Sequence, residues 1–139
     1  MKVQSNDRPE KIQVIGNKTY LNLDIKDISY VAEGDVQVSM FEYEQFMFLN
    51  PVSESVLKQT EKNYRLQTII VTTQNGNTFD GNETARNNML SAINSAEFIG
   101  RTEETWKLAD NSSVLVQLPE LKEALALSIQ EVGNIVKGY

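Results

Sequence analysis

The chain contains neither cysteine nor histidine. The lack of cysteine excludes disulfides, cysteine-ligated zinc and thiol catalysis. The lack of histidine removes the commonest general base and the commonest ligand of transition metals. Any catalysis would therefore depend on carboxylate, lysine, tyrosine or serine side chains. Because no complete carboxylate loop replaces the missing ligands, we expect no tightly bound metal or cofactor.

Long apolar runs and clusters of basic residues are also scarce. No run approaches the ~20 apolar residues that a membrane-spanning helix needs, and the first eleven residues lack an apolar signal segment. We therefore expect synthesis in a cytoplasm and no membrane insertion. Thirteen basic residues stand against nineteen acidic ones, which gives a net charge of −6. Because the basic residues are scattered, a nucleic acid would be repelled, and we expect no such partner.

The rest of the composition is that of a folded protein. Of the 139 residues, 40% are hydrophobic and only seven are glycine and three proline, which is typical of globular chains. The pattern of elements predicts an α+β fold in three segments. They are a sheet-rich attachment module at residues 1–50, a connecting helix at 51–66 and an α+β domain at 67–139.

The first segment alternates apolar and polar residues. After a polar arm at residues 1–10, a strand at 12–15, the turn Gly16–Asn17 and a strand containing Leu21, Leu23 and Ile25 form a hairpin pattern. A short strand at 28–31 and a longer one at 36–49 follow, separated by a turn at 33–35. The apolar phase changes within the long strand, which predicts a bulge or bend near Glu44–Gln45.

Four aromatic residues crowd the end of this segment: Phe41, Tyr43, Phe46 and Phe48. One interpretation is packing in the core or on a face of the sheet. The other is a surface that docks a partner subunit, because an apolar patch left exposed on a small domain usually marks an interface. We take these four residues as the candidate interface.

The second half predicts a repeated hairpin–helix order. A helix from about Ser53 to Asn63 or beyond precedes a strand at 66–73, the Asn75–Gly76 turn and a strand ending at Phe79. A helix begins near Asn82 and ends at Gly100. Strands at 105–108 and 114–118 flank the turn at 110–112, and a helix covers 119–136. The apolar stripes of the two later helices are Ala85, Met89, Ala92, Ile93 and Ala96, and then Leu121, Leu125, Ile129, Val132 and Val136. The second stripe is widened by Ala124, Leu127, Ser128 and Ile135. We expect these two helices to cover the hairpins.

No motif here indicates a reaction. Asp80-Gly81-Asn82-Glu83 is similar to the start of a calcium loop but lacks the remaining ligand spacing, so a turn and helix cap is the better interpretation. The carboxylate pairs Asp24–Asp27 and Glu103–Glu104 lack the apolar pocket and cleft of a glycosidase, and surface charge is favoured. Trp106, the only tryptophan, is expected to pack in the core. We expect no catalytic residues.

Four segments follow one another in a distinctive order and spacing within residues 67–137. They are Phe79-Asp80-Gly81, Arg86-Asn87-Asn88-Met89 with Ala92-Ile93, Thr105-Trp106-Lys107-Leu108-Ala109-Asp110-Asn111 and Leu118-Pro119-Glu120-Leu121. In this series residues 67–137 resemble a C-terminal domain of uncharacterised function found in tailed-bacteriophage tail and tail-fibre-associated proteins. No catalytic residues are assigned in that family, so none is carried over.

The resemblance implies a non-catalytic structural component of a phage tail, baseplate or fibre-attachment apparatus, located in the virion tail. Its partners would be other tail or fibre subunits, in a homo-oligomer within a symmetric assembly. Two alternatives stay open. One is a tail-fibre assembly chaperone that is not retained in the virion, and the other is a hydrolase acting on cell-surface glycan.

Overall fold

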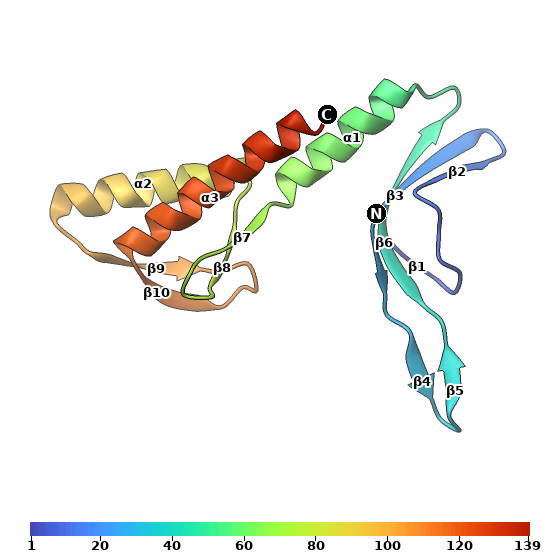
Figure 1. Cartoon of the computed structure of the whole chain (residues 1–139), viewed down its shortest axis with the longest axis horizontal. Helices are drawn as coiled ribbons and strands as arrows, with labels where there is room; N and C mark the ends of the chain where they lie inside the picture. The colour runs from blue at the N-terminus through green and yellow to red at the C-terminus, as the bar shows by residue number, and fades with distance from the viewer. The chain divides into compact units, whose positions relative to one another are not determined.

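A computed structural model describes all 139 residues, which form ten strands and three helices (Figure 1). The mixture of antiparallel strands and helices confirms the predicted α+β class. The chain forms two compact units, Met1–Gln59 and Thr60–Tyr139, and helix α1 (Glu54–Gln67) crosses from the first to the second. No helix is long and apolar enough to cross a membrane.

The first unit is built on a four-stranded antiparallel sheet with the order β1-β6-β3-β2. These strands are β1 (Lys2–Ser5), β2 (Ile12–Ile15), β3 (Lys18–Asp27) and β6 (Phe41–Leu49). Between β3 and β6 the chain forms a separate hairpin of β4 (Tyr30–Ala32) and β5 (Val36–Val38). The predicted strand at 36–49 is therefore two strands, with a break at residues 39–40.

The predicted hairpin at Gly16–Asn17 is confirmed. Ile15 lies opposite Lys18, and Gly16 has the positive φ of +60° that this tight turn needs. The bulge or bend predicted near Glu44–Gln45 adjoins an irregularity of the ladder, because the register of β6 against β3 shifts between Glu44 and Glu42. The extra residue lies in β3, between Leu23 and Lys26, where Asp24 adopts a φ of 51°. Aspartate tolerates this left-handed conformation better than most residues.

The second unit repeats a hairpin followed by a helix. Its elements are β7 (Ile70–Thr72), β8 (Thr78–Asp80), α2 (Glu83–Ile99), β9 (Glu103–Lys107), β10 (Ser113–Gln117) and α3 (Leu118–Lys137). A core of eleven buried apolar residues joins both hairpins to α2 and α3, and the partly buried Trp106 packs against it. The strand predicted at 66–73 begins too early, because α1 continues to Gln67.

Both hairpin loops have the same backbone hydrogen bond and a left-handed residue at the same position. In the first, Gly76 N–H donates to the Thr73 carbonyl at 2.9 Å and Gly76 has a φ of +86°. In the second, Asn111 N–H donates to the Leu108 carbonyl at 2.9 Å and Asn111 has a φ of 68°. Each loop is thus a three-residue hairpin whose last position is left-handed, a conformation that glycine and asparagine accept.

Helix α2 begins and ends where the sequence predicts. The Asn82 side chain accepts a hydrogen bond from Ala85 N–H at 2.9 Å, and Gly100 ends the helix in the left-handed conformation.

The stripe predicted on α3 is partly wrong, because Ile129 and Val136 are exposed. Leu121 of the stripe is buried, as are Ala124 and Ser128, which were expected to widen it, and so are Leu118 and Glu120 in the first turn. Steps of three and four residues stay on one face, whereas two successive steps of four drift by roughly 80°.

Candidate interaction surface

The sheet of the first unit is a single layer. Every extensive contact between elements within Met1–Gln59 joins two strands. Its strands bury only Leu21, Leu23 and Tyr43 as apolar side chains, compared with the eleven residues of the second unit's core. A sheet normally buries one face against a second layer. The first unit therefore leaves apolar surface uncovered.

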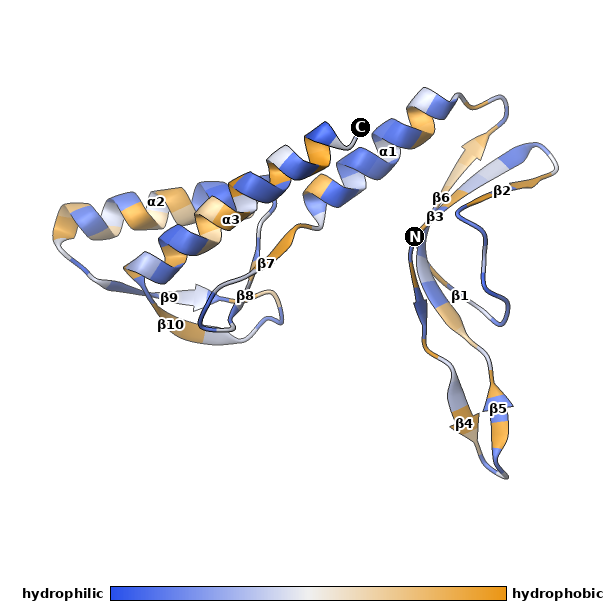
Figure 2. Cartoon of the chain, in the orientation of Figure 1, coloured by the Kyte–Doolittle hydropathy of each residue, from blue (hydrophilic) through white to orange (hydrophobic).

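That apolar surface gathers at one end of the sheet. Five side chains there are between 45% and 66% exposed. They come from β2 and the C-terminal part of β6, where Figure 2 shows apolar residues. We call this set the sheet-end surface, and its members are Ile12, Val14, Ile15, Met47 and Leu49. On β3, Lys18 lies opposite both Ile15 and Leu49, so these ends of β2 and β6 flank the same residue of the intervening strand.

The four predicted interface residues do not lie together. Side chains alternate along a strand, so Phe41 and Tyr43 lie on one face of β6 and Phe46 and Phe48 on the other. Tyr43 is only 6% exposed, and the three phenylalanines are half-buried.

Phe46 and Phe48 adjoin the sheet-end surface. They lie opposite Leu21 and Thr19 of β3, whose partners on β2 are Ile12 and Val14. Paired residues share a face of the sheet, so these two aromatics lie on one face with Ile12 and Val14. Ile15, Met47 and Leu49 occupy the alternate positions and lie on the other face of the same sheet end. The aromatic pattern in the sequence missed the contribution of β2. The signal that could have found it is the absence of charge from Ile12 to Ile15.

Strand β2 is an edge of the sheet with unpaired backbone groups. The two-residue turn makes Ile15 and Lys18 a hydrogen-bonded pair, so the backbone of Gln13 and Ile15 bonds inward to β3. The Asn22 N–H donates to the Lys11 carbonyl at 2.8 Å, which fits this alternation. The N–H and C=O groups of Ile12 and Val14 therefore point outward. Natural edge strands commonly carry a charge that prevents pairing, and β2 has none.

A buried amide fixes this edge in place. Asn22 is 1% exposed. Its Nδ2 donates to the Glu10 carbonyl at 2.8 Å and to Gln13 Oε1 at 3.3 Å, and its Oδ1 accepts from Gln45 Nε2 at 3.0 Å. These bonds tie the start of β2, β3 and β6 together. The buried amide thus fixes the position of β2 beside β3.

The carboxylates considered for catalysis have structural contacts. Asp27 accepts a hydrogen bond from Ser29 N–H at 2.9 Å, and bonds from Ser29 hold the pKa of Asp27 below its usual value. Glu103 accepts from Gln117 Nε2 at 2.9 Å, and Glu104 pairs with Arg101. The structure contains no group of three or more acidic residues placed to hold a metal.

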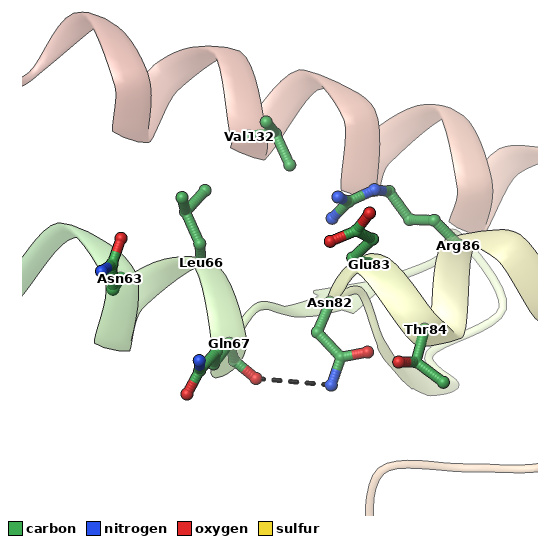
Figure 3. Close-up of a pocket in the computed structure, with 8 residues that line it drawn as sticks. All are labelled: Asn63, Leu66, Gln67, Asn82, Glu83, Thr84, Arg86 and Val132. Atoms are coloured by element: carbon green, nitrogen blue, oxygen red, sulfur yellow. Dashed lines mark hydrogen bonds between the residues drawn. The ribbon is translucent and has the colours of Figure 1, made fainter.

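A cleft of about 680 Å³ lies between the end of α1, the start of α2 and α3 (Figure 3). Arg86 and Glu83 reach from α2 toward α3, and Asn82 Nδ2 donates to the Gln67 carbonyl at 3.4 Å. Arg86 itself donates to the Gly81 carbonyl at 2.6 Å. Because the guanidinium is engaged and a carboxylate shares the space, this cleft does not offer an anion site.

No protein-family model matches the chain, and no curated protein or solved structure is significantly similar to it.

Proposed function

We propose that the chain is a non-catalytic structural component of a bacteriophage tail, baseplate or fibre-attachment apparatus. Its N-terminal unit would bind other virion subunits through the sheet-end surface. The observation that supports binding is the single-layer sheet with its exposed apolar end and open edge. The assignment to a tail rests on the resemblance of residues 67–137 to tail-associated proteins.

Stability gives the first physical reason. Folding orders each residue at a cost of about 1–2 kcal/mol in backbone entropy, which burial of apolar surface must offset. A sheet that buries only Leu21, Leu23 and Tyr43 offsets little of it. A partner that covers the sheet-end surface would supply the missing burial. An obligate contact of this kind typically covers roughly 2,000 Å² or more.

The open edge specifies the kind of contact. A partner strand added beside β2 would satisfy the outward backbone groups of Ile12 and Val14, and its side chains would cover both faces of the sheet end. The uncharged strand imposes no electrostatic penalty on this addition. We propose a strand from a neighbouring subunit as the occupant, in an oligomer of copies within a symmetric tail assembly.

Mass spectrometry of purified particles tests the proposal. The chain should be present in stoichiometric amount, and Leu49→Lys should fold yet fail to be incorporated. Leu115→Lys is the matched control, because Leu115 is 61% exposed on β10 of the second unit and Leu49 is 65% exposed.

Incorporation of both variants would contradict an interface at the sheet end. A wild-type chain that is monomeric and missing from particles would favour the assembly chaperone instead.

A further inference from the structure

A second hollow, lined by none of the residues of the sheet-end surface, lies in the C-terminal unit. Its volume is about 400 Å³, within the range of about 300–1,000 Å³ that is typical of small-molecule sites. It lies at the end of β8, beside the first turns of α2 and along β9. We call it the Trp106 hollow, and its lining residues are Asp80, Ala85, Asn88, Ser91, Trp106 and Lys107.

The polar side chains of this hollow have no partners within the chain. Asp80, Asn88 and Ser91 are exposed, and their side chains make no hydrogen bond or ion pair with another residue. The indole N–H of Trp106 and the ammonium of Lys107 are equally free of internal acceptors. Elsewhere in this unit many polar side chains are engaged, as Glu120 is with Thr73 and Asn77. The hollow thus gathers one carboxylate, one amide, one hydroxyl and one indole donor that remain available.

Trp106 supplies a rigid aromatic wall. It is only partly buried and packs against the core, while its remaining surface lines the hollow. It lies opposite Val114 in the β9–β10 ladder, which fixes its place on the strand. Three lining residues of α2, Ala85, Asn88 and Ser91, follow one another at intervals of three and so share one side of the helix. Both walls are therefore held by regular structure.

We propose that the Trp106 hollow binds a sugar ring of a glycan. A pyranose has an apolar C–H face that packs on an aromatic ring and a rim of hydroxyl groups that need paired donors and acceptors. Asp80 accepts, Asn88 both donates and accepts, and Ser91 does either. An indole presents a large apolar surface together with a polar N–H, which suits such an amphipathic ligand.

Other ligand classes fit this lining less well. A lipid would leave the carboxylate and the amide unpaired. A free phosphate would face the Asp80 carboxylate with only Lys107 to attract it, and a metal would find a single carboxylate. A nucleic-acid strand could stack a base on Trp106, but the net charge of −6 repels its backbone.

The single tryptophan makes the test specific. Glucose, galactose, mannose and N-acetylglucosamine are titrated separately into the ¹⁵N-labelled full chain, and the only indole N–H signal is followed by NMR. At least one sugar should shift this signal and the amides around Asn88 in a saturable way. Sorbitol is the control ligand, because it carries the hydroxyl groups but lacks a ring with an apolar face.

Two variants separate the site from general solvent effects. Asn88→Ala should weaken sugar binding by roughly tenfold, the loss of one or two good hydrogen bonds. Asn87→Ala, one residue away on the same helix and outside the hollow, should bind like the wild type. Trp106→Leu keeps an apolar residue but removes the ring, so a folded Trp106→Leu chain should lose binding.

The proposal is overturned if no sugar shifts the indole signal beyond the effect of sorbitol. It is equally overturned if the Asn87→Ala and Asn88→Ala chains bind alike. Because binding is measured on the isolated chain, failure here leaves the sheet-end interface standing. Failure of particle incorporation likewise leaves the sugar site standing.

Discussion

Glu120 has a structural role that the sequence alone does not indicate, because it holds the β7–β8 loop against α3. In the sequence it is an acidic residue in the first turn of a helix, where the helix dipole favours it. In the structure it is 7% exposed and ties the β7–β8 loop to α3. Its Oε1 accepts from Thr73 Oγ1 at 2.7 Å and Asn77 Nδ2 at 2.9 Å, and its Oε2 accepts from Asn75 Nδ2 at 3.1 Å.

We expect Glu120→Gln to reduce the free energy of unfolding by about 1–3 kcal/mol. Glutamine has the same shape, but its NH₂ group donates hydrogen bonds and cannot accept them. It would replace one of the two carboxylate oxygens, so at least one of the donors Thr73, Asn75 and Asn77 would lose its acceptor. Glu131→Gln is the control on the same helix, and it should change stability by no more than about 0.5 kcal/mol. Urea unfolding of the three proteins measures both values. Equal stabilities would show that the buried carboxylate is not an anchor.

The same residue predicts a pH dependence. Burial, the largest influence, raises the pKa of Glu120, but the hydrogen bonds from Thr73, Asn75 and Asn77 outweigh it and leave the pKa below the ordinary 4.5. A carboxyl whose pKa is lower in the folded state stabilises the fold above its unfolded pKa, and this stability is lost as the pH falls through the folded pKa.

The stability difference between wild type and Glu120→Gln should therefore be constant near neutral pH and shrink as the pH falls below about 4.5. Unfolding curves at several pH values measure it. A difference that grows on acidification would mean that the folded pKa is raised.

Of the glycines, Gly81 has the backbone that lies closest to other side chains. A Cβ atom added there would lie 2.5 Å from Ile69 Cγ2 and 2.6 Å from Ser128 Oγ, both on buried side chains. We expect Gly81→Ala to destabilise the protein by about 1–3 kcal/mol, the usual cost of overpacking.

Gly133 provides the opposite case on α3. A Cβ there meets nothing within 4 Å, so Gly133→Ala should stabilise the helix by up to about 1 kcal/mol. Melting temperatures of the two variants should move in opposite directions. A fall for both would point to a packing role for Gly133 that its open surroundings do not explain.

At the scale of elements, the sequence predicted what local chemistry decides. Gly76 and Asn111, which occupy left-handed positions, allowed both C-terminal hairpins to be predicted. Asn82 and Gly100 indicated the two ends of α2. The strand after α1 was predicted to begin too early, at residue 66, because Leu66 and Gln67 are good helix formers placed beside a β-branched run. The Thr68 N–H still donates to the Tyr64 carbonyl at 3.1 Å. The helical hydrogen bonds therefore continue to the point where the β-branched residues begin.

The pairing between strands far apart in the chain could not be predicted from the sequence. β1 lies beside β6, about forty residues away, and no pattern within either strand specifies that neighbour. The order β1-β6-β3-β2 decides which aromatics share a face with the exposed residues of β2. For this reason the sequence indicated an apolar interface in the right segment but grouped Phe41 and Tyr43 with the wrong face. The Trp106 hollow also needed the fold, because its residues come from three elements.

At the scale of the whole molecule, the two units should differ in local stability. The eleven-residue core belongs to Thr60–Tyr139, whereas the first unit holds few buried apolar residues. In hydrogen exchange of the isolated chain, amides of β2 and β3 should therefore open at a lower free energy than those of α2 and α3, because local opening exposes little apolar surface there. Similar protection in both units would mean that the first needs no partner.

Assembly should then change exchange at particular amides of β2. The N–H groups of Ile12 and Val14 point outward from the edge, while those of Gln13 and Ile15 already bond to β3. A partner strand added beside β2 would protect both outward amides, so mass spectrometry of exchange in a peptide covering this strand should show them protected only in assembled particles. The residues of the β4–β5 hairpin serve as the internal reference, because the proposed contact does not include them. Contact through the faces alone would leave the amides of Ile12 and Val14 exchanging freely, and strand addition would then be wrong even if the sheet end is buried.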